Sequence, residues 1–150
     1  MPTMEKAART NAGLASELRF SVMRLRRRLA GERDPGNPLS IAAMAVLGSL
    51  RRNGGQLTVG ALAQLERVQP PSMTRTVNCL ERGGYVVRRP HDDDGRVVLV
   101  CLSDLGRQVL KADRARRDAW LAQRLSGLTS DERAALRAAA PILERLANTD

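Results

Sequence analysis

Aromatic residues are scarce in this sequence of 150 residues, where Phe, Tyr and Trp occur once each and make up 2% of the chain. Proteins that bind single-stranded DNA or RNA stack the bases on aromatic side chains, and Phe20, Tyr85 and Trp120 are too widely spread to form such a platform. A chain of this length can still form one domain with a sizeable core, which must be built from Leu, Val, Ala and Met. The shortage of rings therefore counts against a binder of single-stranded nucleic acid.

Patterns typical of enzymes and metal sites are also missing. The single histidine, His91, is followed by Asp92, Asp93 and Asp94, but no second cluster of ligands accompanies them, so we interpret this stretch as a solvated loop. No serine lies in a Gly-x-Ser-x-Gly elbow, no Gly-x-Gly-x-x-Gly follows a predicted strand, and no phosphate-binding P-loop occurs. We expect neither enzymatic activity nor a metal or other cofactor.

Cysteine and long apolar runs are few. Cys79 and Cys101 lack the spacing of a metal site and are expected to be free thiols of an intracellular protein, and whether either senses redox state stays open. Residues 1–11 are polar and do not resemble a signal peptide, and no apolar run approaches the roughly 20 residues that span a bilayer. We therefore expect a cytoplasmic protein with no membrane partner.

Positive charge, in contrast, is abundant. The formal net charge is +9 and the pI is about 11.2, a balance that favours a polyanionic partner. One basic cluster, Arg24 with Arg26, Arg27 and Arg28, lies near the end of the first predicted helix. Solvation, a favourable interaction with the helix C-terminus, and contact with phosphate are all open for this cluster.

Residues 70–82 are predicted to form a helix with one buried and one exposed face. Pro70 or Pro71 suits the first helical turn, where the missing backbone N–H would have had no intrahelical partner. Met73, Val77 and Leu80 recur at i, i+4 and i+7 and form one apolar stripe. The residues expected to point away from the core are Pro71, Ser72, Arg75, Asn78, Cys79 and Arg82.

The segments on either side complete a recognisable unit. Thr58 can cap a short helix over 59–66, in which Leu62 and Leu65 lie three apart on one side. After the second helix, Gly83-Gly84 can supply a residue at positive φ, and 85–89 and 96–102 are predicted strands around a polar turn at 90–95. The sequence predicts a helix-turn-helix followed by a β-hairpin wing.

Four further helices are predicted outside this unit. Apolar residues recur with helical spacing from about 10 to 30, and Ser40 can cap a buried helix that stops at 53–55. Ser103 can cap a helix that extends to about residue 125. At about 1.5 Å per residue, this helix is longer than one small winged domain requires. Residues 129–132 fit a capping box, before a last helix that is kinked or broken near Pro141.

Taken together, these motifs resemble the MarR family of winged helix-turn-helix repressors. The resemblance rests on Leu57-Thr58-Val59 with Leu62-Ala63, on residues 70–75 and 80–86, and on Asp94-Gly95-Arg96 followed by residues 102–106. It implies a mostly α fold with a small β-hairpin wing (α+β) in a single domain, 1–150. The winged helix-turn-helix would occupy 57–102, and helical dimerisation segments 8–31 and 103–148. The sequence departs from the family pattern at three positions. Arg67 stands where the family often has a glycine, Gln69 where it often has a capping serine, and Gly95 where it often has an arginine.

The resemblance implies a sequence-specific regulator of transcription that binds double-stranded DNA. We expect a ligand-responsive repressor that binds a palindromic operator as a homodimer. Ser72 and Arg75 are the candidates for base edges in the major groove, and Pro71 for a thymine methyl group. Contact with phosphate or ordinary solvated surface is open for Thr74, Thr76, Asn78, Arg88 and Arg89. Arg96 is the candidate for the minor groove, with Asp94 orienting it.

Two alternative functions also fit the sequence. A sequence-independent architectural DNA-binding protein and an RNA-binding basic protein are the alternatives, and DNA affinity without sequence preference would favour the first. Members of the family bind small aromatic acids between the dimer helices and the winged lobe. Phe20, Met44 and Trp120 are therefore candidates for an effector pocket, with plain core packing as the alternative. The operator, the regulated genes, the effector and the direction of regulation do not follow from the sequence.

Overall fold

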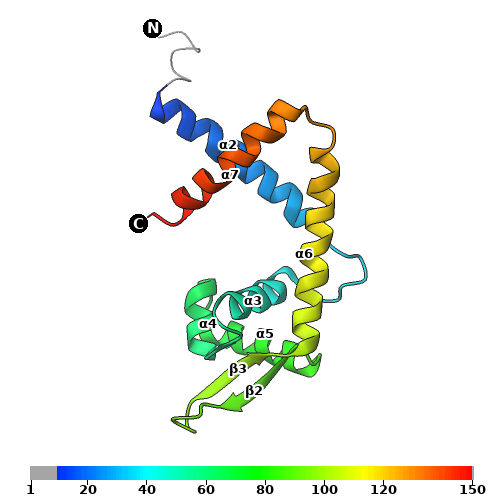
Figure 1. Ribbon diagram of the computed structural model, residues 1–150. Coiled ribbons are helices and arrows are strands. Elements are labelled where there is room, and N and C mark those ends of the chain that lie inside the picture. The colour runs from blue at the N-terminus through cyan, green and yellow to red at the C-terminus, as the bar shows by residue number, and fades with distance from the viewer. Residues whose placement is uncertain (1–9, 150) are drawn as a thin grey trace. The chain divides into compact units, whose positions relative to one another are not determined.

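The structure is a computed structural model that describes residues 10–149 (Figure 1). In chain order the elements are α2 (Asn11–Gly31), α3 (Ile41–Arg52), β1 (Gln56–Leu57), α4 (Val59–Glu66), α5 (Pro70–Arg82), β2 (Val86–Pro90), β3 (Val98–Leu102), α6 (Asp104–Leu125) and α7 (Ser130–Ala147). The predicted mostly helical fold with a small hairpin wing is confirmed. Residues 8 and 9 of the predicted 8–31 segment lie outside the described residues.

The chain divides into two compact units. The winged unit comprises 34–115 and holds α3, α4, α5, the sheet and the first part of α6. The helical unit comprises the described parts of 1–33 and 116–150, with α2, the rest of α6 and α7. The predicted winged helix-turn-helix at 57–102 lies inside the winged unit, which also includes α3. Among residues 10–149, no helix combines the length and the apolar character needed to cross a membrane.

The predicted helix starts are confirmed by their caps. Thr10, Ser40 and Thr58 each accept a hydrogen bond from the backbone N–H three residues later, at 3.0–3.1 Å. Thr129 and Glu132 form the predicted capping box in both directions. Each bond satisfies one N–H group that has no partner within its own helix, so these local contacts set where the helices begin.

The sheet has three antiparallel strands in the order β1-β3-β2. β2 and β3 form the wing hairpin, in register from Val86 opposite Leu102 to Pro90 opposite Val98. β3 begins two residues later than predicted, because the Val97 N–H donates to the Asp94 carbonyl (3.0 Å) and closes the turn. Pro90 is tolerated at the end of β2 because this strand lies at the sheet edge. β1, which the sequence did not predict, pairs with β3.

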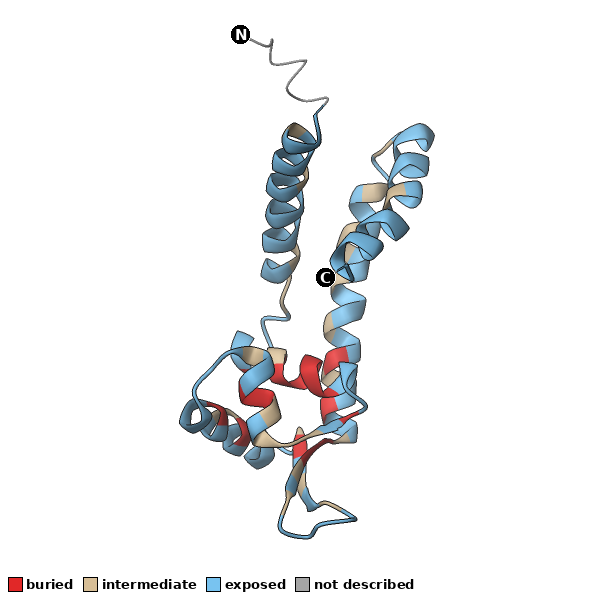
Figure 2. Cartoon of the chain, turned by 90° about the vertical axis from the view of Figure 1, so that its left-hand side faces the viewer, coloured by how far each residue is buried: buried red, intermediate tan, exposed pale blue. Residues whose placement is uncertain are grey.

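The hydrophobic core lies in the winged unit, where Figure 2 shows the buried residues. The predicted stripe of Met73, Val77 and Leu80 is confirmed, since each is at most 2% exposed. Leu62 and Leu65 lie three apart in α4 as predicted, but Leu65 is 52% exposed, and Ala63 is the residue buried beside Leu62. At about 100° per residue, Leu65 lies about 200° from Ala63, so it turns away from a contact face centred on 62–63. The other fully buried large side chains are Leu47, Leu50, Val46, Val86 and Val100.

The turn between α4 and α5 shows what the departures from the family pattern do. Arg67 adopts the left-handed conformation (φ 53°, ψ 44°), which a glycine would enter without steric strain. Gln69 is the N-cap of α5, and its side chain makes no capping hydrogen bond. The two prolines at the start of α5 reduce the number of N–H groups that need a cap, so the helix still begins at Pro70.

The helical unit has a different character, because neither α2 nor α7 has a buried residue. Both helices instead expose large apolar side chains: Leu14, Phe20, Val22, Met23 and Leu25 on α2, and Leu136, Ile142, Leu143 and Leu146 on α7. The predicted break at Pro141 is absent, since α7 continues through it to Ala147. Much apolar surface therefore remains on these helices.

Candidate nucleic-acid interface

The exposed face of α5 has the composition predicted for it. Pro71, Ser72, Thr74 and Arg75 are exposed in its first half, and Asn78 continues the face. The face is held out by the buried stripe on the opposite side of the same helix, which packs against α3, α4 and β2. A rigid helix that presents small, polar and basic side chains can place hydrogen-bond donors and acceptors against the edges of base pairs.

Thr76 is the exception on this helix. Its side chain is half-buried, and its hydroxyl donates to the Ser72 carbonyl oxygen at 3.1 Å. This bond within the helix satisfies the hydroxyl locally, as is common for threonine four residues after a carbonyl. Thr76 is thus less available for phosphate than Thr74.

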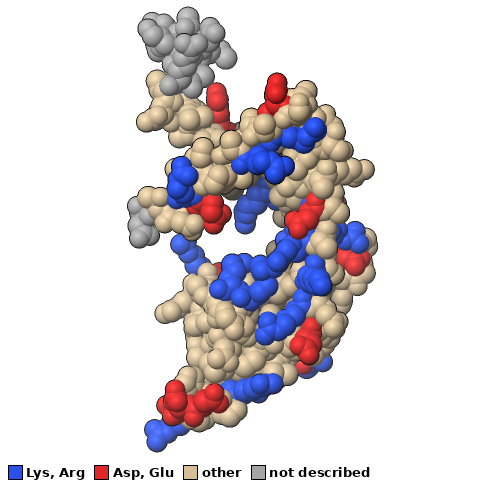
Figure 3. All heavy atoms as spheres, in the orientation of Figure 1, with Lys and Arg blue, Asp and Glu red and all other residues tan. Residues whose placement is uncertain are grey.

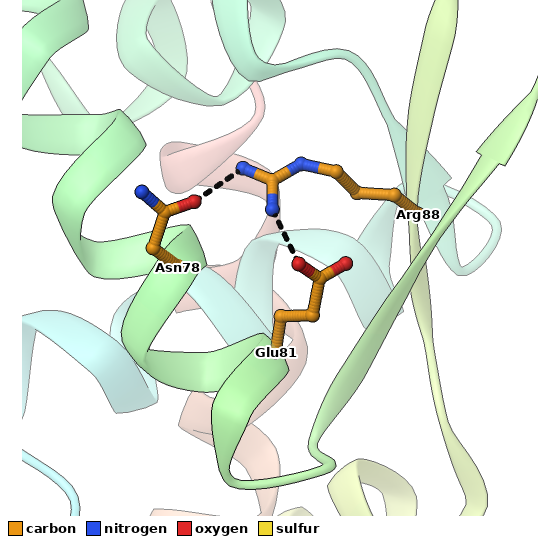
Figure 4. Close-up of polar contacts among 3 residues, drawn as sticks. All are labelled: Asn78, Glu81 and Arg88. Atoms are coloured by element: carbon orange, nitrogen blue, oxygen red, sulfur yellow. Dashed lines mark hydrogen bonds and ion pairs between the residues drawn. The ribbon is translucent and has the colours of Figure 1, made fainter.

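Asn78 and Arg88, which were separate candidates in the sequence, are brought together by the structure (Figure 4). Arg88 Nη2 donates to Asn78 Oδ1 at 2.8 Å, and Arg88 Nη1 forms an ion pair with Glu81 Oε1 at 2.7 Å. The sequence analysis did not identify Glu81 as a functional residue. The only signal was its spacing of three residues from Asn78, which places the two on neighbouring positions of one helix surface.

The wing carries Asp94 and Arg96 at its tip, and both are exposed. Figure 3 shows acidic and basic atoms next to each other at the end of the hairpin. Asp94 Oδ1 accepts a hydrogen bond from the backbone N–H of Arg96 at 3.0 Å. Through this bond the Asp94 carboxylate shapes the turn that carries Arg96, and its orientation of the guanidinium stays a prediction. Arg89 is exposed on the neighbouring strand β2.

A hollow of about 510 Å³ opens beside the wing, between β1, the start of α4 and the hairpin turn. Its lining residues are Gln56, Leu57, Thr58, Ala61, His91, Asp93, Asp94, Val97 and Leu99. His91 Nδ1 accepts from the Asp93 backbone N–H at 3.1 Å. Across residues 10–149 no cluster of His, Cys, Asp and Glu has the arrangement of a metal site.

The three candidates for an effector pocket have different surroundings. Met44 belongs to the core of the winged unit, where Asn37 Nδ2 lies 3.5 Å from its sulfur, so core packing describes it. In the helical unit, Phe20 is 63% exposed, and Trp120 has the guanidinium of Arg124 over its ring at 3.8 Å and that of Arg28 at 5.6 Å. These cation–π contacts place positive charge on the indole. The hollow beside the wing contains none of the three.

The two cysteines are free thiols, as predicted. Cys79 is exposed on α5, and Cys101 is buried in β3.

Comparison with known proteins decides which family this arrangement belongs to. Residues 37–97 match the MarR family model. An HTH-type transcriptional regulator of Mycobacterium bovis is 47% identical over 134 residues, which cover 89% of this chain and 92% of that one. The chain belongs to the MarR family. As a member of that family it is a DNA-binding transcriptional regulator.

Solved structures agree with this assignment to the MarR family. A transcriptional regulator from Pseudomonas aeruginosa superposes with a TM-score of 0.83 at 36% identity, covering 99% of both chains. A mutant of Staphylococcus aureus MepR, solved bound to an oligodeoxyribonucleotide, has a TM-score of 0.66 at 18% identity, covering 89% of this chain and 97% of that one. At that identity the second likeness shows the fold alone.

Proposed function

We propose that this MarR-family regulator is a repressor that binds a palindromic operator as a homodimer and responds to a small aromatic effector. The observation that carries the proposal is the exposed face of α5, where Ser72 and Arg75 stand opposite a fully buried stripe. A helix fixed in this way can enter the major groove with its side chains already placed. The oligodeoxyribonucleotide bound by the MepR mutant supports DNA as the ligand of this fold.

In the proposed complex, α5 reads base edges through its first half. Arg75 can donate two hydrogen bonds to the O6 and N7 atoms of guanine, Ser72 can donate or accept, and Pro71 can contact a thymine methyl group. Thr74, exposed on the flank of α5, is a candidate for phosphate. Such contacts fix the register of the helix in the groove.

The wing supplies the second part of the proposed interface. Arg96 is exposed at the tip of the hairpin, and an arginine inserted into a narrow minor groove is favoured by the negative potential there. Arg89, on the edge strand β2, is a candidate for the phosphate backbone. Asp94 contributes by holding the turn that carries Arg96.

The homodimer is proposed from the helical unit. α2 and α7 expose nine large apolar side chains, each at least 39% exposed. A second copy of the chain can cover such surface, and a two-fold axis would then direct one α5 to each of two half-sites about one turn of DNA apart. A palindromic operator is the DNA sequence that matches this symmetry.

Binding of the proposed effector can be followed through Trp120. Trp120 is the only tryptophan, so the intrinsic fluorescence of the protein reports on the surroundings of this ring. Titration with salicylate as a probe should change that fluorescence and, over the same concentration range, release operator DNA. Release without a fluorescence change would place the effector away from Trp120, and neither effect would remove this class of effector from the proposal.

The experiment that tests the proposed function is selection of operators from random duplex DNA, followed by footprinting of the region upstream of the gene. We expect protection of one palindrome with a preference of roughly 10³-fold or more over a scrambled duplex at the same salt concentration. Equal affinity for all duplexes, governed only by salt, would indicate an architectural DNA-binding protein. Preference for RNA hairpins over duplex DNA would indicate an RNA-binding protein.

A further inference from the structure

The Asn78–Glu81–Arg88 cluster joins the recognition helix to the first strand of the wing. Asn78 and Glu81 come from α5 and Arg88 from β2, and the Arg88 guanidinium binds both of its partners at 2.7–2.8 Å. The side chains of Arg88 and Glu81 are 28% and 40% exposed, so the ion pair is partly shielded from water. One arginine thus binds two side chains of the helix at the same time.

The chemistry of the guanidinium determines how the Asn78 amide is turned. Arginine has five N–H donors and no acceptor, so only the amide oxygen of Asn78 can face it. The Nδ2 group must then point away from Arg88, as Figure 4 shows. Asn78 is exposed and lies three residues after Arg75, on the face of α5 that is proposed to meet DNA.

Glu81 decides what Arg88 can do. An exposed arginine on a strand beside a recognition helix is an ordinary candidate for phosphate contact. Here the Glu81 carboxylate neutralises the charge of Arg88 locally and engages Nη1, while Nη2 is engaged by Asn78. A carboxylate at this place also repels phosphate, so Arg88 is better arranged to orient Asn78 than to bind the DNA backbone.

We propose that Glu81 and Arg88 are positioning residues for DNA recognition, which hold Asn78 so that its amide group acts as a hydrogen-bond donor toward the DNA. This inference rests on the proposed function. The expected partner of Nδ2 is an acceptor, either on a base edge or on a phosphate. The usual reading of adenine by asparagine needs both Oδ1 and Nδ2 to face the base, and in this cluster Oδ1 faces Arg88 instead.

A double-mutant cycle on the selected operator tests the coupling. Asn78→Ala and Arg88→Ala should each weaken operator binding about fivefold, as expected for one hydrogen bond. The double variant should bind as Asn78→Ala does, because Arg88 acts through Asn78. The dependence of operator affinity on salt should not change. Arg89→Ala, one residue along the strand, is the matched control and should have the same effect with or without Asn78.

Three results would overturn the inference. Arg88→Ala could weaken operator binding equally in the wild type and in Asn78→Ala, and reduce the salt slope of binding by about one. Arg88 would then be a phosphate contact. Equal loss of affinity for operator and scrambled DNA, with a lower unfolding temperature, would make the cluster merely structural. Retention of full operator affinity by Glu81→Gln and Arg88→Ala would show that Asn78 needs no positioning.

Modified operators identify the acceptor. Replacement of purine N7 by C–H, one position at a time, should weaken binding of the wild type but not of Asn78→Ala if Nδ2 donates to a base. If Nδ2 donates to a phosphate instead, methylphosphonate substitution of that phosphate should weaken binding of the wild type but not of Asn78→Ala. Either result supports Asn78 as a hydrogen-bond donor. If removal of an adenine N6 amino group weakened binding of the wild type but not of Asn78→Ala, Oδ1 would be reading the base. That result would overturn the inference. Absence of any preferred operator would overturn the proposed function, whereas a preferred operator without coupling would overturn this inference alone.

Discussion

The winged unit and the helical unit of this protein differ in where their apolar side chains lie. In the winged unit the core extends from Leu39 to Leu110 and draws on α3, α4, α5, the sheet and α6. In the helical unit, α2 and α7 have no buried residue, although each carries several large apolar ones. The difference indicates that the winged unit is complete within one chain, whereas the helical unit needs another surface to cover it.

The physical reason lies in how apolar residues are distributed on the helices. α3 is apolar on most sides, and every residue from Ala43 to Leu50 except Ala45 is buried, because the helix contacts α4, α5 and the sheet. α2 mixes its apolar residues with arginines, so it can bury one side only.

The core of the winged unit should be the most sensitive region. Leu80→Ala removes a fully buried side chain and should lower the free energy of unfolding by about 2–5 kcal/mol. The measurement is denaturant unfolding at several protein concentrations. Leu143→Ala in α7, a residue 39% exposed, is the control, and its effect should depend on concentration. A large effect of Leu143→Ala at every concentration would mean that the helical unit has a core of its own.

The helical unit should instead control assembly. Leu25→Asp combined with Leu146→Asp places charge on the apolar surface of α2 and α7 and should give monomers at micromolar concentration in sedimentation velocity. Leu65→Asp changes a side chain of similar exposure in the winged unit and should leave the dimer intact. Monomers already in the wild type would contradict the proposed assembly.

Base reading should belong to the winged unit alone. Arg75→Ala should weaken operator binding by about 1–3 kcal/mol and relax the preference at one base pair of each half-site. Arg145→Ala removes the same charge from the exposed surface of α7 and should leave sequence preference unchanged. A loss that is uniform over all DNA sequences would assign Arg75 to the phosphate backbone.

The wing gives a smaller and more specific effect. Arg96→Ala should abolish most discrimination in favour of A·T-rich flanks. Asp94→Ala should weaken operator binding by about 0.5–1.5 kcal/mol because the Arg96 N–H loses its acceptor, whereas Asp94→Asn keeps an acceptor and should bind nearly as the wild type does. Tighter binding by Asp94→Ala on both kinds of flank would show that Asp94 acts only as a negative charge near DNA.

The smallest effect concerns the turn before the recognition helix. Arg67→Gly should raise the free energy of unfolding by about 0.5–1 kcal/mol, since φ at this position is positive. Arg51→Gly, in the last turn of α3, is the control and should lower it by about as much. Thermal unfolding measures both, and destabilisation by Arg67→Gly would show that the arginine side chain matters more than the backbone angle.

The sequence by itself determined the features that depend on neighbouring residues. Caps at Ser40, Thr58 and Thr129, the stripe on α5 and the positive φ of Gly84 follow from local hydrogen bonds and helical periodicity, and all are present in the structure. The family pattern also ends in a glycine at 106, where a Cβ would clash with the Tyr85 carbonyl oxygen as α6 passes the sheet. That contact, unlike the caps, joins residues 21 positions apart and was not visible in the sequence.

Only the tertiary structure decided the features that need two distant segments. β1 exists because Gln56 and Leu57 meet β3, and Leu65 is exposed because α4 turns Leu62 and Ala63 to the core. The same holds for the contacts of Arg88 in β2 with Glu81 and Asn78 in α5, which join two separate elements. Periodicity gives the direction of a side chain relative to its own helix, whereas its partners depend on how the helix packs. That packing is set by the whole core, and local sequence does not encode it.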